Sequence, residues 1–267
     1  DELIHAVLKQ PALRTGRRMS HVFRFDIPLY PKPLLITDAA LNINPTLKEK
    51  VDIIQNAIDF ARILGVAVPK ALEDLTQPAY AKLLVVQNPA TSSPGYAFLL
   101  ATIGAMGEDK AFDFWAKLRA NGLKVAKGWS EAYYTEFSQN GGKHPMVVSY
   151  ATSPAAELFY SKTKLAEPPT GSLSLLGAVF RQVEGVALVK GGKNRAAAEK
   201  FVDFMRSAPV QTGMQTEMWM FPAEAGVAKA EAFKFAPEPT AFSAPSDADI
   251  AAKGAEWVAR WTKAVLK

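Results

Sequence analysis

Two segments of the chain place hydroxyl side chains directly in front of a proline. TSSPG at 91–95 and SYATSP at 149–154 each lie at the end of an apolar stretch typical of a buried strand. Ser93 is placed to cap the following helix, and Pro94 takes its first position, where the missing N–H costs nothing. Such a helix start offers free amides, hydroxyls and a positive dipole end to an anion or a hydroxyl group. An ordinary N-cap uses the same residues, so the spacing leaves both interpretations open.

Three aromatic residues stand near these segments or in comparable positions. Trp129 directly follows a strand candidate, Tyr150 ends another, and Trp219 lies in the segment EMWMFP. An aromatic ring at a strand-to-helix junction faces the cleft of an α/β lobe, where it can stack on a cationic heteroaromatic ligand. Filling of the core is the alternative for any large aromatic residue. Glu131 could balance a ligand cation, or it could favour the dipole of the helix that starts there.

Other kinds of chemistry find little support in the sequence. The chain has no cysteine, which excludes disulfides, thiolate nucleophiles and cysteine-ligated zinc. His5, His21 and His144 show neither triad nor metal-ligand spacing, and Asp26 and Asp38 suit strand ends or turns. The sequence also contains no GxGxxG element and no P-loop. We therefore expect no enzyme, no metal site and no cofactor.

Composition allows an ordinary folded protein of two lobes. The chain has 267 residues, of which 49% are hydrophobic, and it carries a net charge of +5. The pair Arg17-Arg18 is its densest basic feature, so we expect no nucleic-acid partner. No apolar run reaches the roughly 18 residues of a membrane helix, and residues 1–5 do not resemble a secretory signal. Either a leader has been removed or the chain was never exported.

The periodicity of apolar residues predicts alternating strands and helices after residue 83. Before that point, the pattern indicates strands at 21–27 and 34–37 and a helix at 46–64 that opens with a Thr46/Glu49 capping box. The later strand candidates are 83–87, 123–126, 146–150 and 185–189. The later helix candidates are 94–106, 110–120, 131–137, 195–206 and 247–265. This alternation is typical of an α/β fold.

The segments LLVVQNPATSSPG, KVAKGWSEAYYTEF, MVVSYATSPAAE and TEMWMFP, taken in this order, resemble the bacterial thiamine-binding periplasmic proteins, the solute receptors of ABC importers. The resemblance covers 72–267, and Asn88 stands where that family usually has Asp. It implies a type II periplasmic-binding-protein-like fold of two α/β lobes, thiamine or its phosphate esters as ligand, an ABC permease as partner, and a periplasmic location. The ligand-binding residues that it implies are Thr91, Ser92, Ser93, Trp129, Tyr150, Thr152, Ser153 and Trp219.

The first 70 residues resemble a different family. TGRRMSHVF and PLLITDAALNINPTLKEKVDIIQNAIDFARILGV are similar to an internal piece of the phosphate acetyl/butyryltransferases, which are cytoplasmic enzymes. This resemblance implies that Arg17 and Arg18 could meet an acyl phosphate or coenzyme A. The C-terminal catalytic element of those enzymes has no counterpart in 72–267, so we expect no acyl transfer.

Together the two resemblances predict a chimera. Residues 1–70 form the transferase-like segment and residues 71–267 the solute-binding region, so that part of the first lobe is foreign or remodelled. We expect a thiamine-type solute-binding module, impaired by the substituted segment, with the rings of Trp129, Tyr150 and Trp219 converging on one groove beside 91–93. The alternatives are a transferase-related protein that binds coenzyme A or acyl phosphate, and a structural chimera that binds no ligand.

Overall fold

A computed structural model describes the backbone of residues 19–28 and the whole of residues 64–163, 165–236 and 238–267. Four sequence predictions lie outside these residues: the strand at 34–37, nearly all of the helix at 46–64, and the roles suggested for Arg17 and Arg18. The described part begins with a short 3-10 turn, η2 (Glu73–Thr76), and a short helix, α4 (Pro78–Ala81).

The centre of the fold is a mixed sheet of six strands in the order β3-β2-β4-β1-β5, with β6 paired to β1. Three neighbouring strands are parallel, and β1 runs antiparallel to β4, β5 and β6. The strands are β1 (Met19–Pro28), β2 (Leu84–Gln87), β3 (Lys124–Ala126), β4 (Met146–Tyr150), β5 (Thr170–Leu173) and β6 (Arg181–Glu184). All four residues of β2 and the first four of β4 are buried, as expected for parallel strands covered on both faces.

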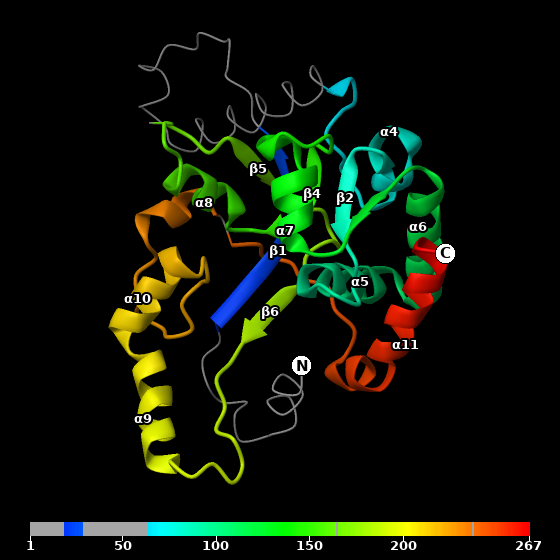
Figure 1. Ribbon diagram of the computed structural model, residues 1–267. Helices are drawn as coiled ribbons and strands as arrows, with labels where there is room; N and C mark the ends of the chain where they lie inside the picture. The colour runs from blue at the N-terminus through cyan, green and yellow to red at the C-terminus, as the bar shows by residue number, and fades with distance from the viewer. Residues whose placement is uncertain (1–18, 29–63, 164, 237) are drawn as a thin grey trace.

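The transferase-like segment supplies β1, which joins the rest of the sheet together (Figure 1). Residues 23–26 of β1 pair with β4, residues 25–28 pair with β5, and residues 19–22 pair with β6. The strand predicted at 21–27 is therefore confirmed and extends to Met19–Pro28. A segment of foreign resemblance thus provides backbone partners for three strands of the solute-binding region.

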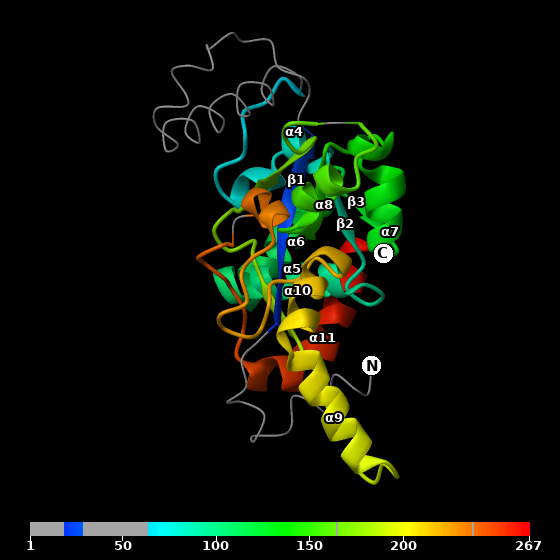
Figure 2. The same ribbon diagram turned by 90° about the vertical axis from the view of Figure 1, so that its left-hand side faces the viewer.

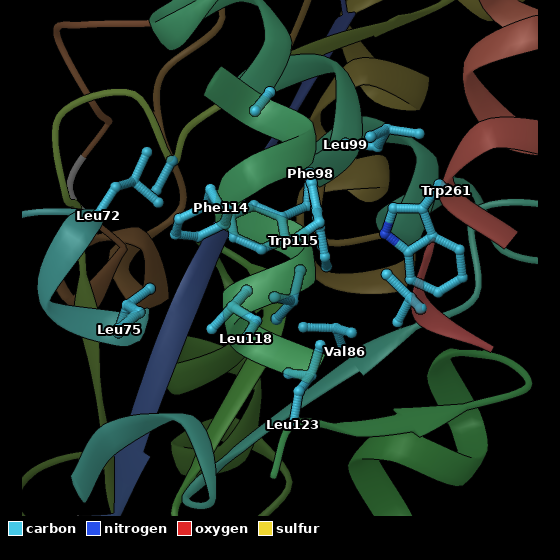
Figure 3. Packing of buried hydrophobic residues seen from close by; sticks show 14 of the residues in the cluster. Leu72, Leu75, Val86, Phe98, Leu99, Phe114, Trp115, Leu118, Leu123 and Trp261 are labelled. Atoms are coloured by element: carbon cyan, nitrogen blue, oxygen red, sulfur yellow. The ribbon is translucent and has the colours of Figure 1, made fainter. Parts of the chain in front are cut away.

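Three long helices cover one part of this sheet and form the main core. They are α5 (Ser93–Met106), α6 (Glu108–Ala120) and α11 (Asp247–Val265). Trp115 lies at the centre, with edge-to-face contacts to Phe98, Phe114 and Trp261 at centroid distances of 5.3, 5.8 and 5.5 Å (Figure 3). Its indole N–H donates to the Thr102 hydroxyl at 3.0 Å, so the one polar atom of this buried ring is satisfied.

A second group of helices lies on the other side of β1 (Figure 1). It comprises α8 (Ser153–Phe159), α9 (Arg195–Arg206), α10 (Ala208–Glu217) and the 3-10 helix η5 (Glu231–Phe235). Both views show α9 extending away from the body of the molecule (Figure 2). None of its residues is buried, although its polar and apolar residues are segregated as in a helix that packs on a partner.

One predicted element is wrong, and another forms a different type of helix. No strand forms at 185–189: β6 ends at Glu184, which pairs with Met19 of β1. The predicted helix at 131–137 is instead a single turn, α7 (Trp129–Glu131), followed by the π-helical segment η3 (Ala132–Glu136) and a 3-10 turn, η4 (Ser138–Asn140). The Phe137 N–H donates to the Ala132 carbonyl, five residues back, which is the wider spacing of a π turn.

Candidate ligand-binding site

The predicted site residues that follow β2, β3 and β4 lie at one edge of the sheet. These three strands are parallel neighbours, so the loops after Gln87, Ala126 and Tyr150 all leave from their carboxyl ends. Ligands of open α/β sheets bind outside the carboxyl ends of the strands. The fold therefore brings the hydroxyl-rich turn at 91–93, Trp129 and the turn at 150–153 into one neighbourhood.

The turn at 91–93 is built by the strand and loop beside it. The Asn88 side-chain oxygen accepts from the Ala90 N–H at 2.9 Å, and the Thr91 hydroxyl donates to the Lys127 carbonyl at 2.6 Å. Gly95 permits the first turn of α5 to lie directly on the end of β2, because a Cβ there would collide with the backbone of Gln87. The hydroxyl turn is thus tied to the loop that carries Trp129.

The cap of α5 differs from the prediction. Ser92 is the N-cap residue, with φ −145° and ψ 124°, and the helix already includes Ser93 and Pro94. The Ser92 side chain makes no capping hydrogen bond, and Ser93 is exposed. Both hydroxyls therefore stand at the positive end of a 14-residue helix without serving it as a cap.

A chain of hydrogen bonds fixes the indole of Trp129. Its ring N–H donates to the Ser149 hydroxyl at 2.9 Å, and that hydroxyl is 2.8 Å from the hydroxyl of Ser153. Ser149 is fully buried at the end of β4, and Ser153 is 6% exposed in the first turn of α8. The indole is thus held across the end of the sheet by residues from two other elements.

Four rings form what we call the Trp129 group: Trp129, Tyr133, Tyr134 and Tyr150. Tyr133 stacks on Trp129 at 4.7 Å with 19° between the planes, and the π turn of η3 carries this tyrosine. The ring centroid of Tyr150 lies 5.8 Å from that of Trp129. Burial and the charge of Glu184 raise the pKa of Tyr150 to about 12, so at neutral pH it is an uncharged hydrogen-bonding phenol.

Trp219 belongs to a second set of rings, the Trp219 group, which it forms with Phe159, Tyr160 and Phe233. It lies parallel to Phe233 at a centroid distance of 6.1 Å and 5° between planes. It also has edge-to-face contacts with Phe159 and Tyr160 at 5.4 and 5.7 Å. The seven residues of α8 connect the two groups, since Ser153 at its start meets the Trp129 group and Phe159 at its end meets Trp219.

The backbone of Trp219 is strained. Its φ is +55°, the one positive φ at a residue other than glycine among the described residues, and a bulky side chain rarely adopts this conformation. The Thr152 hydroxyl donates to the Trp219 carbonyl at 2.9 Å and holds the backbone there. Strain of this kind clusters at functional sites, where surrounding contacts impose a special side-chain position. Thr152 is 3% exposed, so we expect it to position Trp219.

The eight predicted ligand contacts remain predictions, but the structure shows what surrounds most of these side chains. Thr91, Thr152 and Ser153 have their hydroxyls engaged in hydrogen bonds, and Trp129 and Tyr150 lie side by side. The ring of Trp219 is joined to them through α8. The predicted convergence of all three rings on one groove also remains a prediction.

Sequence reasoning missed two polar residues of this region. Ser149 was quoted only as part of its motif, yet it accepts the hydrogen bond of Trp129. Glu157 lies on α8 four residues after Ser153, so helical spacing places the two on one face, and this was the available signal. Burial raises the pKa of Glu157, and hydrogen bonding from Tyr133 and Gln139 opposes that rise.

The structure also contains a cavity of about 310 Å³. Its walls come from 174–179 and 238–241, and none of the eight predicted residues lines it.

The described residues contain no group of three or more His, Asp or Glu side chains arranged to hold a metal ion. Within the same ranges, no helix combines the length and apolar character that a bilayer crossing requires.

Comparison with known families decides the ancestry of the larger part of the chain. Residues 52–253 match the model of the bacterial extracellular solute-binding proteins. The chain belongs to this family. Its relatives include the thiamine-binding periplasmic protein of Salmonella typhimurium, 32% identical over 199 residues, and that of Brucella suis, 33% identical over 205 residues. Each match covers 74% of this chain and 58% of the relative, so the chain spans little more than half of these relatives.

Solved structures confirm the fold class. A periplasmic thiamin binding protein superposes with a TM-score of 0.68 at 25% identity, covering 93% of this chain and 66% of the other. The periplasmic binding protein P5PA gives a TM-score of 0.66 at 18% identity, covering 98% and 72%. The predicted α/β fold of the type II periplasmic-binding-protein kind is therefore confirmed.

The N-terminal resemblance is confirmed as well. Residues 3–72 match the model of the phosphate acetyl/butaryl transferases. The phosphate acetyltransferase of Rickettsia prowazekii is 51% identical over 83 residues, which cover 28% of this chain and 24% of that enzyme. The chain thus contains segments of two families, and the segment shared with the enzyme is about a quarter of the enzyme's length.

Proposed function

We propose that residues 71–267 act as a solute-binding module whose ligand is thiamine or one of its phosphate esters. The observation that carries this proposal is the Trp129–Tyr150 ring pair, fixed by buried serines at the carboxyl edge of the parallel strands. The thiamine-binding relatives supply the identity of the ligand.

The chemistry of the region suits such a ligand. A thiazolium ring is flat and cationic, and the face of a tryptophan attracts such a ring by stacking and by cation–π interaction. The uncharged Tyr150 phenol can accept or donate a hydrogen bond without opposing the ligand's charge. Ser92 and Ser93, at the start of α5, offer hydroxyls and the positive end of the helix to a hydroxyethyl or phosphate group.

We propose further that the ligand is bound more weakly than by a complete receptor. The chain spans 58% of its thiamine-binding relatives, so part of the cleft wall of a complete receptor has no equivalent here. Loss of one aromatic wall costs on the order of 1 kcal/mol or more, and loss of closure costs further. The transferase-like segment supplies β1, which pairs with β4 of the solute-binding region. This pairing supports the fold around the site more than it supports the affinity for the ligand.

Calorimetric titration with thiamine and with thiamine monophosphate tests this function. We expect saturable binding at micromolar or weaker affinity, which the variant Trp129→Ala abolishes. Phe204→Ala is the matched control, because it removes an exposed ring on α9, outside both ring groups. Absence of saturable binding would refute the thiamine proposal, whereas sub-micromolar affinity would show that the substituted segment restores the complete site.

In a cell, such a module would deliver its ligand to an ABC permease from the periplasm. We propose this location and partner on the strength of the solute-binding relatives. The test is whether the chain copurifies with a cognate permease from membranes, and whether this copurification depends on thiamine.

A second candidate function has one observation in its favour, the match of residues 3–72 to the phosphate acyltransferases. This function is binding of coenzyme A or acyl phosphate, without acyl transfer. Calorimetric titration with coenzyme A and with acetyl phosphate measures this binding, and an exchange assay between the two compounds, in which we expect no activity above the uncatalysed rate, tests for acyl transfer. A third possibility, a structural chimera without a ligand, predicts no thermal shift with either class of compound.

A further inference from the structure

The helix α8 presents two residues, one turn apart, to the stacked pair of Trp129 and Tyr133. Ser153 reaches the indole of Trp129 through the Ser149 hydroxyl. Glu157, four residues later, has Tyr133 and Gln139 as its hydrogen-bonding neighbours. The Glu157 carboxylate is therefore a neighbour of Tyr133, whose ring stacks on the indole of Trp129 at a centroid distance of 4.7 Å.

The carboxylate of Glu157 has neutral partners in the described part of the chain. Its neighbours, a phenol and an amide, are both neutral donors. In the described ranges no lysine, arginine or histidine forms an ion pair with it. A half-buried carboxylate without a cationic partner is costly unless something else supplies positive charge.

The surroundings of the Trp129 group carry negative charge on a second side as well. The charge of Glu184, on β6, acts on the Tyr150 phenol. Glu157 and Glu184 come from different elements and act on two different rings of the same group. A cationic ring seated against Trp129 and Tyr150 would be attracted by both acids, and the partly desolvated setting strengthens such attraction.

We propose that Glu157 is a specificity-determining residue, which makes the Trp129 group select cationic aromatic ligands over neutral ones. This inference rests on the proposed function and deepens it, since it names a ligand class and a residue that sets it. Glu157 acts through space and through Tyr133; it is not itself a stacking contact. Its charge is compensated when a cation occupies the site.

The test compares two aromatic probes of nearly equal shape, N-methylquinolinium, which is cationic, and quinoline, which is neutral at pH 7.5, together with thiamine. Titrations are carried out on the full chain and on Glu157→Gln. We expect the substitution to weaken binding of both cations by about tenfold and to leave quinoline within about twofold. Glu256→Gln, which removes an equal charge from the exposed face of α11, should leave all three affinities unchanged.

Three outcomes would overturn the proposal. Equal losses of affinity for quinoline and N-methylquinolinium would mean that Glu157 only positions Tyr133. Unchanged affinities would mean that the charge of Glu157 does not contribute to binding, and failure of the unmodified chain to bind either cation would mean that the site does not select cations. Binding of N-methylquinolinium that depends on Glu157, with no binding of thiamine, would refute the thiamine function and leave this inference standing.

Discussion

The helices on the two sides of β1 differ sharply in how much of their apolar surface is buried. On the side of α5, α6 and α11, three tryptophans are almost fully buried in one core: Trp115, Trp257 and Trp261. On the side of α8, α9 and α10, the core is a small cluster around Phe221 and Phe233, and α9 buries no residue. Among the described residues, the first region therefore has an extensive core, whereas the second has a small one and leaves the apolar face of α9 exposed.

The contrast can be set beside the comparison with relatives. It spans 58% of its thiamine-binding relatives, and the segment before residue 71 resembles another family. A helix whose apolar residues gather on one side gains stability from tertiary packing, and α9 has no buried residue on that side. Phe201 and Phe204 illustrate this, because they are 54% and 58% exposed and contact each other at the surface of α9.

The largest expected effect is loss of the core around Trp115. We expect Trp115→Ala to lower the free energy of unfolding by about 3–5 kcal/mol, because it leaves a cavity and removes the partner of the Thr102 hydroxyl. Urea denaturation followed by circular dichroism measures the change, with Trp115→Phe as the milder control. A loss below about 1 kcal/mol would mean that this side is no better packed than the other.

The next effect concerns the junction between the two regions, where Thr152 holds the strained backbone of Trp219. We expect Thr152→Val to cost about 1 kcal/mol of stability, the usual net value of one hydrogen bond. Thr152→Ser keeps the hydroxyl and should be close to neutral. If the two variants were equally stable, the hydrogen bond to the Trp219 carbonyl would not be what holds φ at +55°.

A smaller effect is expected on α9. Phe204→Ser should change the free energy of unfolding by no more than about 0.5 kcal/mol, because the ring is mostly exposed in the folded chain. It should also reduce self-association, measured by light scattering against concentration, since the variant shrinks an exposed apolar patch. Destabilisation comparable to that of Trp115→Ala would show that α9 is packed in solution and would abolish the contrast.

The smallest effect depends on pH. Burial raises the pKa of Glu157 in the folded chain, so its contribution favours folding below the ordinary carboxyl pKa and is lost as the pH rises through the raised value. Tyr133 and Gln139, which face it, are neutral at these pH values. Glu157→Gln should therefore have a slightly higher melting temperature than the parent at pH 7 and the same one near pH 4. A lower melting temperature at pH 7 would contradict this sign.

Much of the fold could be predicted because local patterns and tertiary pairing agree. The helices at 195–206 and 247–265 and the strand at 146–150 have the bounds that their apolar periodicity predicts. The strand predicted at 185–189 is wrong, because the apolar run gives no information on where the pairing of β6 with β1 stops, and β6 ends at Glu184. The π turn at Ala132–Glu136 also escaped prediction, since the sequence does not encode the stacking of Tyr133 on Trp129 that the turn accompanies.

The sequence by itself determined the two ancestries, the α/β class and the residue types that could meet a ligand, because motifs and periodicity are local properties. Only the tertiary structure decided that β1 joins three strands of the solute-binding region, that Ser149 holds the indole of Trp129, and that Thr152 fixes Trp219. It also decided that Glu157 lies beside the Trp129 group. The physical reason is distance along the chain: these contacts join residues whose approach depends on sheet register and helix packing, which no single segment specifies.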